Sequence, residues 1–262
     1  MRPLTKQEET EYYKIIEPLQ NLHKKMGKFV PAQWMLSSLG INPAVMLVGI
    51  NPGLGGGDCA NCKYNCLNPN LNENKNCHWE PVRSRNDAQK QLQAPNGSKE
   101  LGVKKNAFAA LMRKCFDETN WKNNTKTDLG KFNMVWTNLS PFRTKSEKKL
   151  NELYDVARKN GEHPRAICRQ AMAKLIGLTR PKIVLIAGKS AFNDVYNGLK
   201  KEYGQDVYLE DKESGVYTAI LELPEELVHI IGFKRRSSVY FWEGRRAKKK
   251  IVKLTSQILG EI

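Results

Sequence analysis

Residues 45 to 59 read VMLVGINPGLGGGDC, and the abrupt change inside this stretch decides how the chain folds. The apolar run ends at Gly49, and five of the nine residues from 49 to 57 are glycine. A short apolar run bounded by turn residues is typical of a buried strand. At the carboxyl edge of a parallel sheet, glycines let a ligand approach the main chain. The alternative is a surface turn, because Asn, Pro and Gly are also ordinary turn residues.

Further apolar runs alternate with helical patterns along the rest of the chain. The expected strands span residues 44–49, 132–139, 181–188 and 226–233. The expected helices span residues 5–22, 104–116, 147–159, 163–178, 189–204 and 244–259. A peripheral hairpin is expected over 206–220, turning near Ser214 and Gly215. This order predicts an α/β fold in one domain, 1–262, with a central four-stranded parallel sheet in a three-layer αβα arrangement.

Net charge is the strongest signal in the composition. The chain carries 43 Lys and Arg against 27 Asp and Glu, a formal charge of +16, and nine of the basic residues lie between 234 and 253. So uneven a field attracts a polyanion and releases its counterions, so we expect a nucleic acid as the partner, and the alternative is a merely soluble basic surface. No apolar run is long enough to cross a membrane and no secretory signal precedes the first helix, so we expect a cytoplasmic monomer.

Three familiar catalytic and nucleotide-binding motifs are absent. Gly188, Lys189 and Ser190 resemble the end of a P-loop, but Ile183 stands where that motif requires glycine. The run that begins at Gly53 misses the dinucleotide fingerprint, because its last required glycine falls on Asp58. There is also no GxSxG nucleophile elbow. We therefore expect no nucleotide cofactor and no serine hydrolase chemistry.

Three blocks of sequence resemble the uracil-DNA glycosylase superfamily. LVGINPG, ending at Gly53, resembles its first motif, and GINPG is similar to the form found in the mismatch-specific uracil/thymine glycosylases. VWTNLSPFRT after the second expected strand and IVLIAGKSAF at the third occur in the order of that superfamily. The resemblance covers scattered blocks between about residues 44 and 258. It implies the uracil-DNA glycosylase fold, and an enzyme that hydrolyses the N-glycosidic bond of a base flipped out of DNA.

The resemblance also implies roles for individual residues. Asn51 would position or polarise the attacking water, a role that suits an amide because positioning and electrostatics supply most of the catalysis. Asn138 would read the pyrimidine edge, since an amide both donates and accepts. The flanking residues of the first motif would line the base pocket: Gly49, Ile50, Pro52 and Gly53. If the resemblance to the superfamily is set aside, the alternative interpretation is that Asn51 is a turn residue and that Asn138 caps a loop.

Two departures from the superfamily change the expected substrate. Its last motif usually carries a histidine, whereas here the chain reads IIGFKRRSSVYFWEGRR, and His229 lies earlier, inside the expected strand. Lys234, Arg235 and Arg236 are then candidates to stabilise the departing base or to grip phosphates. Gly53 also replaces the tyrosine that excludes bulk at pyrimidine C5. We therefore expect release of uracil, thymine or a modified pyrimidine, including a bulky modified cytosine of phage DNA.

Four cysteines form a separate cluster in a metal-binding loop at about residues 54–80. Cys59, Cys62, Cys66 and Cys77 lie close together in a loop rich in glycine and asparagine. Such a set suits structural zinc, with His78 as a substitute fourth ligand. The alternatives are an iron–sulfur cluster and an unmetallated loop. Cys115 and Cys168 lie on apolar helices and are expected to be core thiols.

A different class of function also fits the composition. A nucleic-acid-binding protein without catalysis would use the same basic C-terminal helix and the same metal loop. It would share the salt dependence of a glycosylase, because both bind through phosphate contacts. Only the enzyme requires Asn51 beside a base pocket.

Overall fold

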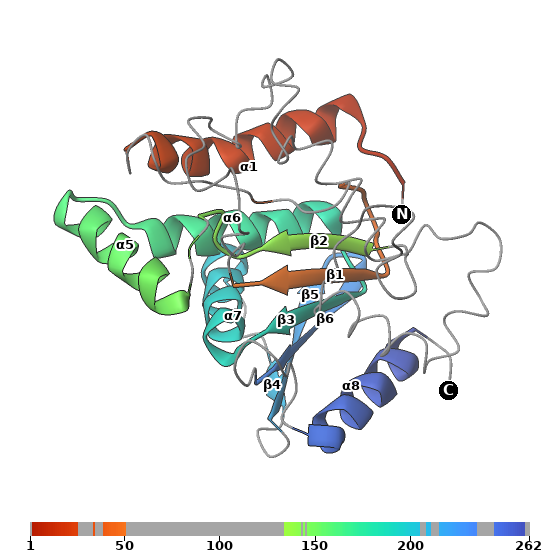
Figure 1. Ribbon diagram of the computed structural model, residues 1–262. Coiled ribbons are helices and arrows are strands. Elements are labelled where there is room, and N and C mark those ends of the chain that lie inside the picture. The colour runs from red at the N-terminus through yellow and green to blue at the C-terminus, as the bar shows by residue number, and fades with distance from the viewer. Residues whose placement is uncertain are drawn as a thin grey trace, which may run out of the picture.

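The computed structural model describes residues 2–25, 34, 39–50, 134–142, 144, 146–204, 208–210, 215–234 and 244–259. Within these ranges the helices are α1 (Lys6–Lys25), α5 (Glu147–Lys159), α6 (Pro164–Thr179), α7 (Lys189–Tyr203) and α8 (Gly244–Ile258). The strands are β1 (Val45–Gly49), β2 (Met134–Asn138), β3 (Ile183–Ala187), β4 (Tyr208–Glu210), β5 (Val216–Leu223) and β6 (Glu226–Phe233). Figure 1 shows their arrangement.

The strands form one sheet in the order β2-β1-β3-β6-β5-β4. The first four of these strands are parallel, with Val45 opposite Met134 on one side and Ile183 on the other. β6 continues the parallel part beside β3, and β5 and β4 then add antiparallel pairs at its far side. Because the parallel strands run the same way, their carboxyl ends meet at one edge of the sheet (Figure 1).

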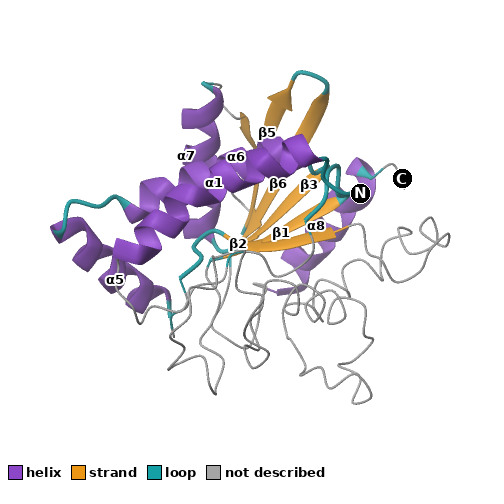
Figure 2. Cartoon of the chain, turned by 90° about the horizontal axis from the view of Figure 1, so that it is seen from above, coloured by secondary structure: helices purple, strands orange, loops and turns teal. Residues whose placement is uncertain are grey.

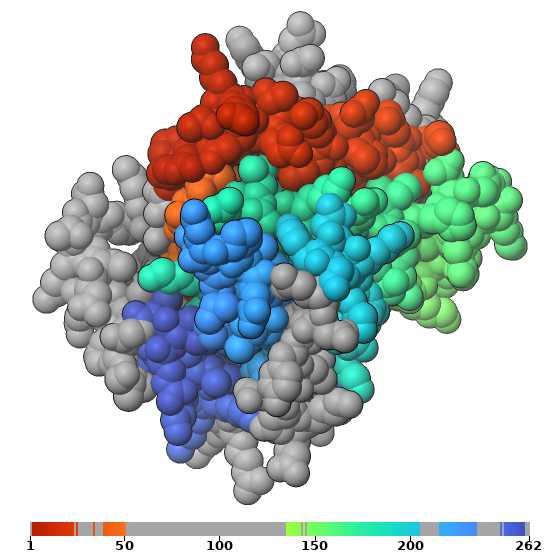
Figure 3. Space-filling model, turned by 180° about the vertical axis from the view of Figure 1, so that it is seen from behind, coloured from red at the N-terminus to blue at the C-terminus, as the bar shows by residue number. Residues whose placement is uncertain are grey.

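Helices cover both faces of the sheet. In Figure 2, α1, α5, α6 and α7 lie on one face and α8 on the other, which gives three layers. Figure 3 shows α1 lying across the molecule beside α6, on the opposite side of the sheet from α8. Parallel strands buried on both faces carry continuous apolar runs, and β3, which reads IVLIA, is buried at all five positions.

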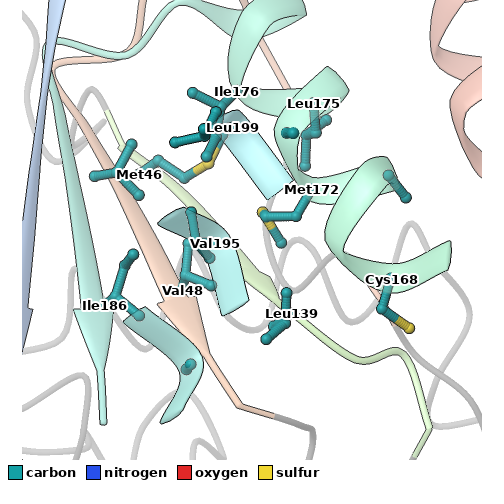
Figure 4. Packing of buried hydrophobic residues seen from close by; sticks show 14 of the residues in the cluster. Met46, Val48, Leu139, Cys168, Met172, Leu175, Ile176, Ile186, Val195 and Leu199 are labelled. Carbon is teal, nitrogen blue, oxygen red and sulfur yellow. The ribbon is translucent and has the colours of Figure 1, made fainter. Parts of the chain in front are cut away.

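Side chains of each strand alternate between two cores. Met46 and Val48 of β1 belong to the larger core, which is filled from α1, α5, α6 and α7. Figure 4 shows Met172 of α6 and Val195 and Leu199 of α7 packing there. Val184 and Ile186 of β3 also belong to the larger core. The alternate side chains of β1 and β3 belong to the smaller core, where Ala247 and Ile251 of α8 close the second face. The period of two in the strands thus divides their apolar residues between the two layers of helices.

Local sequence signals set the helix boundaries. At the start of α1, the Thr5 hydroxyl accepts from the Glu8 amide at 3.3 Å and the Glu8 carboxylate accepts from the Thr5 amide at 2.8 Å. This reciprocal pair is a capping box. Ser146 caps α5 by accepting from the Lys149 amide. α7 ends at Gly204, whose φ of 64° is left-handed and suits glycine.

The mostly parallel α/β fold is confirmed, but the prediction of a four-stranded sheet is wrong. The predicted hairpin exists as β4 and β5, and it belongs to the main sheet. The prediction did not include the turn at Pro224 and Glu225. This turn connects β5 to β6, which pair in antiparallel register starting with Leu223 opposite Glu226. This pairing joins the hairpin to the parallel strands and raises the strand number to six. The helix expected at 104–116 lies outside the described residues.

Candidate functional site

The order of the strands reverses between β1 and β3: the chain adds β2 on one side of this pair and β6 on the other. Adjacent strands whose connections leave in opposite directions open a crevice at their carboxyl ends, where α/β proteins bind ligands. Gly49, Ile50 and Gly188 lie at this carboxyl edge of the sheet, and a Cβ built on Gly188 would lie 3.2 Å from Ile50 Cδ1.

Backbone hydrogen bonds hold this edge firmly. The amides of Leu139 and Ser140 donate to the carbonyls of Gly49 and Ile50, at 2.8 and 2.9 Å. The Gly188 amide donates to the Phe233 carbonyl at 2.9 Å, joining the ends of β3 and β6. Gly188 has φ of 110°, which side chains rarely allow, so glycine is required at this bend. The edge is therefore a fixed frame for the side chains that it carries.

Asn138 is the most unusual side chain at this edge. It ends β2 directly opposite Gly49, and only 3% of its surface is exposed. A Cβ built on Gly49 would lie 2.6 Å from Asn138 Oδ1, so the amide lies against the end of β1. Among the described residues nothing accepts a hydrogen bond from Asn138 Nδ2. An unpaired buried donor costs about 1 to 3 kcal/mol, so an acceptor that reached Nδ2 would be bound favourably.

Thr137 and Asn138 show that the two faces of β2 differ at this end. The Thr137 hydroxyl donates to the Trp34 carbonyl at 3.1 Å, in the larger core. Asn138 points to the opposite face by strand alternation, the face on which Trp136 and α8 lie. The Trp34 indole nitrogen is also buried without a partner among the described residues, but its ring stacks on Tyr12 within the larger core. The unpaired amide at the sheet edge is thus on the α8 side.

A second polar cluster lies at the same edge on the other face. Ser190 Oγ donates to Glu147 Oε1 at 2.6 Å, joining the first turns of α7 and α5. Both residues line a cavity of about 20 Å³ together with Ile50 and Ser140, room for about one water. Sequence analysis missed this pair. The available signal was that both residues begin helices that follow the carboxyl ends of strands.

Tyr154 and Cys168 form the buried wall of this cavity. The Tyr154 hydroxyl lies 3.4 Å from Cys168 Sγ. Burial raises the pKa of the Cys168 thiol to about 12 and holds the pKa of Tyr154 well above its usual value. Both groups therefore stay protonated near neutral pH. The prediction that Cys168 is a core thiol is confirmed, since only 2% of it is exposed.

The structure brings together part of the predicted site. Gly49, Ile50 and Asn138 converge as described above. Lys234 follows β6 at the same edge, exposed, with its amide donating to the Gly215 carbonyl at 2.8 Å. β3 stands between β6 and β1. Lys234 therefore lies roughly 10 Å from β1 by the spacing of two strands.

The remaining predicted site residues lie outside the described residues. In the first and last motifs these are Asn51, Pro52, Gly53, Arg235 and Arg236, and in the metal loop they are Cys59, Cys62, Cys66, Cys77 and His78. Within the described ranges, no three His, Cys, Asp or Glu side chains are grouped to hold a metal ion. No helix in those ranges is long and apolar enough to cross a membrane.

His229 lies away from the candidate site. It stands opposite Ile183, at the amino end of β3. At about 3.3 Å per residue, it is roughly 13 Å along β6 from Phe233 at the carboxyl edge. Burial lowers the pKa of this half-buried histidine. His229 therefore does not replace the missing histidine of the last motif at this edge.

Comparisons with known proteins give no independent assignment. No model of a known protein family matches the sequence, and no curated protein matches it.

Proposed function

We propose that the protein is a DNA N-glycosylase that releases uracil, thymine or a modified pyrimidine. The observation that carries the proposal is the buried, unpaired amide donor of Asn138 at the carboxyl edge of the sheet, next to Gly49. A pyrimidine presents carbonyl oxygens or a ring nitrogen that accept from such a donor. The motifs that resemble the uracil-DNA glycosylases run through this same edge, where β1, β2 and β3 end.

The proposed reaction is hydrolysis of the bond between the base and the sugar. The nucleotide leaves the duplex and its base enters the crevice, where Asn138 binds the pyrimidine edge. The glycosidic bond breaks and the base leaves with the bonding electrons. Water, positioned by Asn51, adds to the sugar carbon and gives up a proton to solvent. An amide suffices for this role, because the bond is largely broken before the water attacks.

Positive charge at the end of β6 and on the outside of α8 supports DNA as the substrate. Lys234 is exposed at the end of β6. On α8, Lys249 and Lys253 are exposed, whereas Ala247 and Ile251 are buried against the sheet. Lysines held on the outside of a packed helix suit phosphate contacts. Arg235 and Arg236 belong to the same basic segment and are proposed to grip phosphates or to stabilise the departing base.

The cysteine loop is proposed as a structural zinc site. Four thiolates from Cys59, Cys62, Cys66 and Cys77 match the ligand number and type that zinc takes in structural sites. Metal analysis of the freshly purified protein should find about one zinc per chain, which Cys59→Ser removes. Iron with visible absorption would instead assign an iron–sulfur cluster.

The test of the proposed function is mass spectrometry of the bases released from DNA. Duplexes containing uracil, a G·T mismatch or a bulky C5-modified cytosine are incubated with the protein, and free bases are measured. The proposal expects at least one base to be released by the wild type and release to be lost in Asn51→Ala.

The exposed lysines of α8 favour a second candidate, a DNA-binding protein without catalysis. It predicts tight, salt-dependent binding with no base released from any of these duplexes.

A further inference from the structure

Gly49 lies where there is no room for a side chain, although its backbone conformation does not require glycine. The described glycines with positive φ are Gly161, Gly188, Gly204 and Gly215, so Gly49 adopts a conformation open to other residues. Its restriction comes instead from space, because a Cβ would lie 2.6 Å from Asn138 Oδ1. Real Cβ atoms essentially never approach another heavy atom that closely. Any side chain at position 49 must therefore displace the Asn138 amide.

We propose that Gly49 is a positioning residue that sets the orientation of the Asn138 amide. Without a Cβ at position 49, the oxygen of the amide lies against the end of β1 while Nδ2 keeps no partner among the described residues. The site then requires a ligand with a hydrogen-bond acceptor, a carbonyl oxygen or a ring nitrogen, opposite Nδ2. That this ligand is a pyrimidine rests on the proposed function.

Other crowded glycines in the chain serve packing instead. A Cβ on Gly232 would lie 2.4 Å from the ring of Phe192, a fully buried side chain of the larger core. A Cβ on Gly177 would meet the Tyr203 hydroxyl, which lies on α7. Gly49 differs because its neighbour is a polar group with an unpaired donor at the ligand-binding edge of the sheet. A Cβ on Gly177 would lie 1.7 Å from the Tyr203 hydroxyl, so Gly177→Ala provides a more crowded control, in which a side chain away from this edge must move.

The expected effect follows from the distance. In Gly49→Ala, Asn138 Oδ1 must move from 2.6 Å to about 3.4 Å for ordinary contact, a shift of roughly 0.8 Å. A misplacement of about 1 Å in a reacting complex costs on the order of a hundredfold in rate. We expect kcat/KM for the preferred base to fall by about that factor and the preference between bases to shrink. Gly177→Ala should keep both.

A double-mutant cycle tests whether Gly49 acts through Asn138. Single-turnover rates on the preferred base and on a competitor are measured for Gly49→Ala, Asn138→Ala and the double variant. If Gly49 positions the amide, Gly49→Ala has no further effect once Asn138 is alanine. Independent, additive losses would overturn the proposal. If Gly49→Ala alone fails to fold, Asn138→Ala should restore folding, because the oxygen that the Cβ meets is gone; failure to restore it would also count against the proposal.

An NMR measurement tests the same contact without enzyme activity. The side-chain amide signals of Asn138 are identified by their loss in Asn138→Ala. They should shift in Gly49→Ala and stay in place in Gly177→Ala, and unchanged signals in Gly49→Ala would overturn the proposal. If the wild type releases no base, the proposed function fails while this result still decides the role of Gly49. If bases are released but the cycle is additive, only the role of Gly49 fails.

Discussion

The two edges of the parallel sheet differ in whether their polar groups have hydrogen-bond partners. At the amino edge, main-chain groups are hydrogen-bonded to one another. The Lys182 amide donates to the Pro43 carbonyl at 3.1 Å, and the His229 amide donates to the Lys182 carbonyl at 3.0 Å. At the carboxyl edge, the main chain is also hydrogen-bonded, but within the described part of the chain the buried amide of Asn138 keeps an unpaired donor. An unpaired buried polar group carries a cost in stability, which a bound ligand with a hydrogen-bond acceptor would offset.

The largest expected effect lies just beyond β1. Asn51→Ala should lower base release by about a hundredfold or more, the scale seen when a positioned polar group is removed from such a reaction. Folding and DNA affinity should stay nearly unchanged, because the substitution takes away neither core volume nor phosphate-binding charge. Single-turnover assays measure the rate, with thermal melts and DNA titrations as controls. A well-folded Asn51→Ala variant with full activity would rule out the proposed role of this residue.

A neighbouring pair on β2 tests the difference between paired and unpaired groups. Thr137→Val removes a hydrogen bond that is made in the protein and should lower the free energy of unfolding by about 1 kcal/mol. Asn138→Ala should lower it by less, because loss of the unpaired donor offsets lost packing. Urea denaturation measures both variants. A loss above about 2 kcal/mol in Asn138→Ala would mean that its amide is paired in the folded protein.

The amino edge should show a small dependence on pH through His229. Burial lowers the pKa of this histidine below its ordinary value of 6.5. As pH falls below about 6.5, the unfolded chain takes up the proton first, so stability decreases; above that pH the contribution is fully present. His229→Gln should flatten this part of the profile. Melting temperatures between pH 5 and pH 8 provide the measurement, and an identical slope in both proteins would contradict the assignment.

The smallest expected effect concerns the Cys168 thiol, which should not react with an alkylating reagent in the folded protein. Because burial raises the pKa of Cys168 to about 12, its thiol should resist iodoacetamide in the native protein at pH 8. Peptide mass spectrometry measures modification at this position, and the urea-unfolded protein is the control that should react. Rapid native modification of Cys168 would show that the wall of the cavity opens.

Much of the fold could be predicted because its signals are local. The apolar runs of the parallel strands, the Thr5 capping box and the helical periods each lie within a few neighbouring residues. The pairing of β5 with β6 was missed because Pro224 and Glu225 make a two-residue turn without the Asn-Gly or Gly-rich signal of common hairpins. Sequence patterns find elements more readily than they find which strands pair.

The candidate site shows the same limit. Asn138 was predicted from its motif, but the close approach of its amide to Gly49 depends on the register between β1 and β2. The hydrogen bond between Glu147 and Ser190 joins two helices that are distant in sequence. Contacts of this kind arise from packing in three dimensions, which one sequence does not specify by local pattern.

The most direct test of the central claim is base discrimination by Asn138→Ala in single-turnover assays. The ratio of rates on the preferred base and on a competing base is compared with that of the wild type, and thermal melts confirm folding. If the unpaired amide binds the pyrimidine edge, the ratio should fall roughly tenfold or more, the equivalent of one lost hydrogen bond. An unchanged ratio in a well-folded variant would contradict the claim that the carboxyl edge reads the base through Asn138.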